Sequence, residues 1–201
     1  MRKLIVGLGT AVTALAVAGI AYAAVNVTFS ATVSPSKANK PTALSVNVAS
    51  TDDTPGALQP PIMNRIVMKL AGGKYNASKF SRCKLASLQA RGPKGCPSKS
   101  KIGTGNGIGR ARPVVEDPVN GKLTIFNGVK QGGRDTVLVY VFPDLGPTFV
   151  SVGKVIKKGK RKHYLIIAPR KCSGTWKGSG TFYFANGETK TVSISQKCKK
   201  R

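Results

Sequence analysis

The sequence predicts an all-β protein, and three features of its pattern indicate a β-sandwich. Short segments alternate apolar and polar residues with a period of two, which is the pattern of half-buried strands. Stretches rich in Gly, Pro, Asn and Ser separate these segments at short intervals. Two of the Asn-Gly pairs, at 127–128 and 186–187, follow strand-like segments in the second half, and such pairs favour tight turns. Many short strands bounded by turns are typical of two packed sheets.

The strand pattern begins at the N-terminal end of the predicted domain. Apolar side chains occupy the odd positions from Val25 to Val33 and, after a turn-like segment at 34–41, the even positions from Leu44 to Val48. This strand–turn–strand opening resembles the first two strands of immunoglobulin-like sandwiches, so we expect an immunoglobulin-like β-sandwich. A Pro-rich loop at 51–61 leads to a third strand at 62–70.

Four cysteines, Cys83, Cys96, Cys172 and Cys198, allow three disulfide connectivities. The sequential pairing closes loops of about a dozen and about two dozen residues, and each would contribute roughly 3 kcal/mol in the chain-entropy model. Zinc needs closer cysteine pairs, and the chain has one histidine. We expect structural disulfides and no metal, with a short, partly helical insertion at 75–97 pinned by Cys83–Cys96.

Residues 102–110 carry glycine at alternate positions. The segment has neither the G-x-G-x-x-G pattern nor the G-K-[ST] ending of phosphate-binding loops. Period-two glycine instead predicts a strand with one face close to another backbone or side-chain layer.

The second half of the chain predicts further strands. Residues 123–126 precede an Asn127-Gly128 turn, and the continuous apolar run at 136–142 indicates a central strand covered on both faces. Strands at 149–156 and 163–168 are joined by a basic loop at 157–162, and we expect them to form a hairpin. The last hairpin joins 175–185 to 189–195 through Asn186-Gly187, with Cys172–Cys198 linking its ends. Residues 113–120 are a candidate boundary, but we favour one domain over 24–201.

The N-terminal segment predicts export. Met1, Arg2 and Lys3 precede an apolar run over 4–20, and Ala21-Tyr22-Ala23 has the small-x-small pattern that signal peptidase cleaves. We therefore expect a signal peptide at 1–23 and a secreted protein in an oxidising space, free or associated with the cell surface. The alternative is that the apolar segment stays uncleaved as an anchor.

Several motifs occur together along the predicted domain. They are Cys83, Cys96-Pro97, Ser-Lys-Ile-Gly-Thr-Gly at 100–105, Phe126-Asn127-Gly128 and a closing hairpin bounded by cysteines. Over most of the mature chain they resemble a group of exported actinobacterial β-sandwich proteins of unassigned function. The resemblance implies a secreted sandwich, and it implies no catalytic residue.

The chain is strongly basic, with 33 Lys or Arg, 7 Asp or Glu and a formal net charge of +26. Between Asp53 and Glu116, and again between Asp144 and Glu188, there is no carboxylate. Such a field attracts polyanions. Lysines outnumber arginines 23 to 10, which favours an anionic envelope polymer or membrane surface over nucleic acid. The alternative is that the charge only keeps the protein soluble.

One basic segment, residues 154–163, is the candidate binding site. Its cations can engage phosphate or carboxylate polymers by releasing counterions. Few aromatic residues interleave with the basic segments, so a single-stranded nucleic acid ranks second. The six cations of the segment are Lys154, Lys157, Lys158, Lys160, Arg161 and Lys162.

Catalysis is the alternative from another class. An extracellular hydrolase could use His163, but the three cations before it disfavour the protonated form that a triad base must reach. The carboxylate pairs Asp52-Asp53 and Glu116-Asp117 lie in turn-like sequence. We expect a non-catalytic protein without a cofactor. A third reading is a structural protein that docks a protein partner through an exposed strand edge or an apolar patch.

Overall fold

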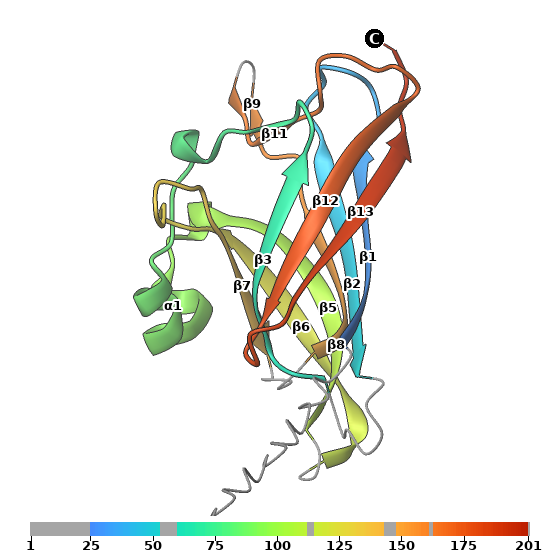
Figure 1. Ribbon diagram of the computed structural model, residues 1–201. Coiled ribbons are helices and arrows are strands. Elements are labelled where there is room, and N and C mark those ends of the chain that lie inside the picture. The colour runs from blue at the N-terminus through green and yellow to red at the C-terminus, as the bar shows by residue number, and fades with distance from the viewer. Residues whose placement is uncertain (1–24, 53–59, 112–114, 143–147, 161–162, 201) are drawn as a thin grey trace, which may run out of the picture.

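The computed structural model describes residues 25–52, 60–111, 115–142, 148–160 and 163–200, and in it two antiparallel sheets face each other (Figure 1). One sheet has the strand order β1-β2-β8-β5-β6-β7 and the other has the order β13-β12-β3. The all-β, sandwich-like prediction is confirmed, although this order does not establish an immunoglobulin-like topology. The strands are β1 (Val25–Ser34), β2 (Ala43–Asp52), β3 (Met63–Leu70), β5 (Lys101–Ala111), β6 (Val115–Asn127), β7 (Val137–Phe142), β8 (Thr148–Val155), β12 (Thr175–Phe184) and β13 (Thr189–Lys197).

Short elements lie at one end of the larger sheet and beside β7 (Figure 1). Two-residue strands pair as β4 (Lys74–Tyr75) with β11 (Ile166–Ile167) and as β9 (Gly159–Lys160) with β10 (His163–Tyr164). The predicted insertion at 75–97 contains the helix α1 (Leu85–Arg91), and three 3₁₀ turns lie within it or directly after it. These turns are η1 (Ala77–Lys79), η2 (Gly92–Gly95) and η3 (Ser98–Ser100).

The core between the sheets lies on the β1 and β2 side. Phe29 of β1 and Val48 of β2 pack with Phe182 and Phe184 of β12. The rings of Phe29 and Phe182 meet edge to face with centroids 5.2 Å apart, a favoured aromatic geometry. A Cβ on Gly180 would lie 2.9 Å from the Phe29 ring, so this close approach requires glycine.

A second core closes one end of the larger sheet. Ile125 of β6 and Val155 of β8 pack with Leu165 and Ile166, which the β4–β11 pair holds against the sheet. A hydrogen bond also ties the chain just after Val155 to the start of β5, because the Ile156 N–H donates to the Ile102 carbonyl at 2.9 Å.

Both expected disulfides form. Cys83–Cys96 ties the insertion together, and its sulfurs pack with Leu88 of α1 against Phe126 of β6. Cys172–Cys198 links the two ends of the β12–β13 hairpin, as predicted. No free cysteine occurs among the described residues.

The glycine-rich segment is a strand, as predicted. β5 pairs with β8 on one side and with β6 on the other. A Cβ on Gly103 or Gly105 would overlap carbonyl oxygens of β8, those of Lys154 and Val152 respectively. The glycines therefore permit a close backbone approach.

The prediction of a central strand at 136–142 is wrong. β7 is the last strand of its sheet and pairs only with β6 among the described residues. Val139 is 51% exposed and Phe142 is 66% exposed. The apolar run has a different cause, because part of the outward face of β7 is covered by α1, while the opposite face is open.

Two predicted connections are also wrong. Asn127-Gly128 is not a two-residue turn, since Asn127 ends β6 and β7 starts at Val137. Strands 149–156 and 163–168 do not pair with each other, because β8 pairs with β2 and β5. The hairpin of the basic segment is the short β9–β10 pair.

Some predictions concern segments that the structure describes only in part or not at all. The signal segment 1–23 and most of the Pro-rich loop lie outside them. Most of the candidate boundary at 113–120 lies within β6, which joins β5 and β7 in one sheet. Within the described residues, no helix has the length and apolar character needed to span a membrane.

Candidate polyanion-binding surface

The basic segment is only partly described. Lys154 is exposed on β8, and Lys157 is exposed with its ammonium 5.8 Å from the centroid of the Tyr164 ring. The backbones of Lys160 and His163 form the β9–β10 pair, but their side chains lie outside the described part. Arg161 and Lys162 lie outside it entirely.

Lys158 fixes the segment to a distant part of the chain. Its ammonium donates hydrogen bonds to the carbonyl oxygens of Lys99 and Lys101, each at 2.6 Å. Partial burial lowers the pKa of the Lys158 ammonium below its ordinary value. Two of the three ammonium donors of Lys158 are thus used within the protein, and Lys158 has a structural role in the segment.

This attachment assembles a cluster that the sequence did not predict. Lys99 and Lys101 are exposed and now lie beside the basic segment, although more than fifty residues separate them in sequence. Neither of the two ion pairs among the described residues, Arg82–Asp135 and Lys190–Glu188, involves these lysines. We call Lys99, Lys101, Lys154, Lys157 and Lys158 the basic cluster.

The candidate carboxylates lie apart from one another. Asp52 ends β2 and Asp117 lies in β6, and β8 and β5 separate these strands in the sheet. Asp53 and the side chain of Glu116 lie outside the described part. Glu116-Asp117 belongs to a strand and not to the turn that the sequence indicated.

A hollow at the tip of the β12–β13 hairpin contains a different carboxylate. It has a volume of about 480 Å³ and is lined partly by Arg65, Tyr183 and Glu188. The Arg65 guanidinium lies 3.8 Å from the centroid of the Tyr183 ring, and Glu188 pairs with Lys190 at 2.8 Å. Glycoside hydrolysis normally uses two carboxyl groups, and the described lining supplies one.

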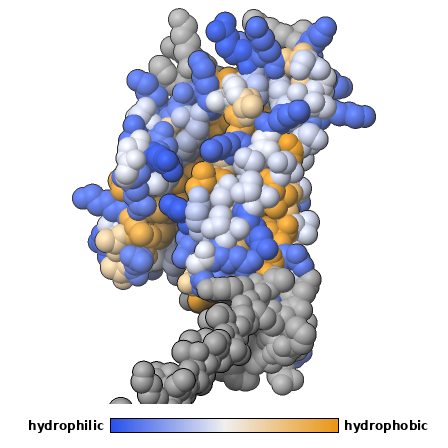
Figure 2. Space-filling view, viewed as in Figure 1, coloured by the Kyte–Doolittle hydropathy of each residue, from blue (hydrophilic) through white to orange (hydrophobic). Residues whose placement is uncertain are grey.

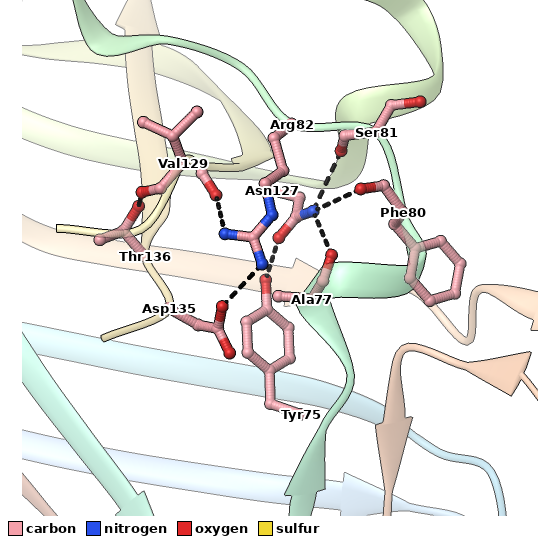
Figure 3. Close-up of polar contacts among 10 residues, drawn as sticks. Tyr75, Ala77, Phe80, Ser81, Arg82, Asn127, Val129, Asp135 and Thr136 are labelled. Atoms are coloured by element: carbon pink, nitrogen blue, oxygen red, sulfur yellow. Dashed lines mark hydrogen bonds and ion pairs between the residues drawn. The ribbon is translucent and has the colours of Figure 1, made fainter. Parts of the chain in front are cut away.

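The most buried polar side chain has a structural role (Figure 3). Asn127 is fully buried, and its amide nitrogen donates to the carbonyls of Ala77, Phe80 and Ser81 at 3.0 to 3.3 Å. Its amide oxygen accepts a 2.9 Å hydrogen bond from the Tyr75 hydroxyl. These bonds fasten the start of the insertion to the end of β6 and leave no amide hydrogen for a ligand.

Apolar side chains are exposed on the inner face of the sandwich. Ile66 and Met68 of β3 lie on the same face as Phe182, yet they are 39% and 43% exposed. Val137 and Val139 of β7 are exposed on the inner face of the larger sheet. Figure 2 shows apolar surface around β3 and in the region of β7 and α1. The smaller sheet leaves this part of the larger one uncovered.

The described residues contain no group of three or more metal-binding side chains of His, Cys, Asp or Glu. Comparisons with protein-family models, curated proteins and solved structures gave no match for this chain.

Proposed function

We propose that the protein is a secreted, non-catalytic binding protein that holds an anionic polymer of the cell envelope at the basic cluster. The observation that carries the proposal is the convergence of two basic segments at Lys158. Four neighbouring lysines, Lys99, Lys101, Lys154 and Lys157, keep their ammonium groups in solvent. Converging cations without carboxylate partners bind polyanions by counterion release.

Retention on an immobilised teichoic-acid-like polymer between about 50 and about 500 mM salt tests the proposal. The test variant replaces the four exposed cluster lysines with glutamine. A matched control replaces Lys69, Lys177, Lys197 and Lys199, which are exposed elsewhere, and so removes the same charge. The cluster variant should lose most of the salt dependence, and the control should keep it. Equal loss in both variants would show that only net charge matters.

The same series on isolated cell envelopes and on DNA identifies the ligand class. Binding to an envelope polymer that survives about 150 mM salt would indicate a shaped site. Equal binding to all three materials that disappears with salt would contradict specific recognition.

The exposed inner face favours a second candidate function, docking of an extended strand from a protein partner. β3 and β7 are the last strands of their sheets, and a free strand edge can pair with an added strand. A second copy of this chain would bring another 33 basic residues. Charge complementarity therefore indicates a partner strand that alternates apolar with acidic residues.

A synthetic peptide of alternating Val and Glu tests this second function. Its binding should shift backbone NMR signals of β7 or β3, and a backbone N-methylated peptide should not bind because it lacks N–H donors. Equal binding of both peptides would exclude strand addition.

A further inference from the structure

The outer face of the larger sheet continues from the basic cluster. In the strand register, Lys154 of β8 lies opposite Thr104 of β5, which lies opposite Thr124 of β6. The next outward-facing row contains Val152, Asn106, Lys122 and Phe142, and the following row contains Val150, Ile108 and Asn120. Each row crosses neighbouring strands, so a polymer held at Lys154 meets these side chains next.

These rows surround a hollow of about 390 Å³. Its apolar lining comes from Ile108, Val150 and Val152, which are 42%, 40% and 46% exposed. Apolar side chains gathered on an open sheet face indicate a surface that a ligand covers. The described polar lining side chains are Asn106, Asn120 and Lys122.

The polar side chains of the hollow are available for binding. Asn106 and Asn120 are exposed, and their amides have no hydrogen-bond partner within the described part of the chain. Each amide offers two donors and one acceptor oxygen. Lys122 lies opposite Asn106 in the register and adds a positive charge. The outward rows of β8, β5, β6 and β7 contain no carboxylate in their described parts.

This combination selects among anionic polymers. A simple polyphosphate is held mainly by cations, because its oxygens accept hydrogen bonds but donate none to an amide oxygen, and it has no apolar face for the floor of the hollow. A sugar ring presents an apolar C–H face together with hydroxyl groups that both donate and accept hydrogen bonds, as amides do. A carboxylate on the sugar matches Lys122, and the ring of Phe142, 66% exposed beside Lys122, offers a further apolar face.

We propose that the outer face of the larger sheet binds an acidic polysaccharide whose sugar units carry carboxylates. The inference rests on the proposed function, because the basic cluster would bind the same polysaccharide where it extends beyond the hollow. The row from Val152 to Phe142 spans four strands, or about 14 Å at the usual strand spacing, which is long enough for an oligosaccharide segment.

The test uses two soluble probes, oligogalacturonate and inorganic polyphosphate, at low and moderate salt. The variant Asn106→Ala/Asn120→Ala removes both amides without changing the charge, and Ser193→Ala/Ser195→Ala, at two exposed positions of β13 in the other sheet, is the matched control. We expect the amide variant to lose about tenfold in oligogalacturonate affinity, the size expected for two hydrogen bonds, and to bind polyphosphate as before. The control should bind both probes unchanged, and circular dichroism checks that each variant folds.

The remaining outcomes distinguish the outer-face site from binding at the basic cluster. If the amide variant binds oligogalacturonate normally, or if the wild-type protein binds only polyphosphate, the outer-face site is wrong while binding at the basic cluster stands. If the wild-type protein binds neither probe nor the envelope polymer at low salt, the proposed function itself fails.

Discussion

Asn127 joins two parts of the chain that are about fifty residues apart. Its amide nitrogen donates hydrogen bonds to three carbonyls of the segment from Ala77 to Ser81. Its amide oxygen accepts a hydrogen bond from the Tyr75 hydroxyl. Buried carbonyls without donors are costly because water cannot replace the lost partner. The stability of this corner therefore depends on one side chain.

Substitution Asn127→Ala should lower the free energy of unfolding by about 3 kcal/mol, since it leaves several buried polar groups without partners. Denaturant unfolding measures this change. Asn120→Ala is the control, because Asn120 is exposed and its replacement should change stability by at most about 0.5 kcal/mol. Equal midpoints for the two variants would show that the Asn127 network contributes little.

Tyr75 makes the same corner sensitive to high pH. The pKa of its phenol is raised from 10.0 to about 12, chiefly by burial and also by the nearby Asp135 carboxylate, while Arg82 opposes the increase. Because the folded-state pKa lies above the unfolded one, this contribution to stability is complete below pH 10 and is lost as pH rises toward 12.

Lysines also titrate in this range, so the test compares the wild-type protein with Tyr75→Phe. The difference in unfolding free energy between them should shrink between about pH 10 and pH 12. Phenolate absorbance should show one late-titrating tyrosine in the wild-type protein that the variant lacks. A pH-independent difference would contradict the raised pKa.

At the scale of single residues, the sequence does not indicate such roles. Asn127-Gly128 has the composition of a turn, and nothing nearby shows that the amide meets Ala77. Lys99 and Lys101 join the basic segment only because Lys158 reaches their carbonyls. These contacts depend on how distant segments pack, which local pattern does not encode.

At the scale of elements, alternation predicted β1 and β12 well because one face of each of these strands is buried. β1, β2, β3, β12 and β13 lie close to their expected ranges. The sequence pattern did not identify β7 as the last strand of its sheet, because its apolar run has two separate causes. Phe126, Leu138 and Tyr140 contact the insertion, whereas Val139 faces an open surface. A continuous apolar run cannot separate these causes from burial in a central strand.

The insertion should depend on its disulfide. α1 has seven residues and no side-chain cap, so it has little stability of its own. Replacing Cys83 and Cys96 with alanine should cost roughly 3 kcal/mol and speed amide exchange in α1, while the amides of β1 and β2 stay protected. If α1 stays protected without the disulfide, the packing of Leu88 is sufficient to hold it.

At the scale of the whole molecule, charge and architecture are predicted with different success. Composition alone gives the charge of +26 and the attraction to polyanions. The unequal size of the two sheets is not encoded in any local pattern, because it depends on which strands pair. That inequality leaves the inner face of β7 uncovered, and the strand register brings the outer rows next to Lys154.

The same charge should make the protein more stable in salt. Like charges repel in the compact state, and added salt screens this repulsion beyond about 10 Å at 0.1 M. The described residues form two ion pairs, so screening removes little attraction there. A gain of about 1 kcal/mol would raise the Tm by roughly 2 to 4 °C.

The variant lacking Lys99, Lys101, Lys154 and Lys157 should start from a higher Tm at low salt and gain less. A Tm that falls with added salt would mean that attractive pairs, and not repulsion, dominate the electrostatics of the fold.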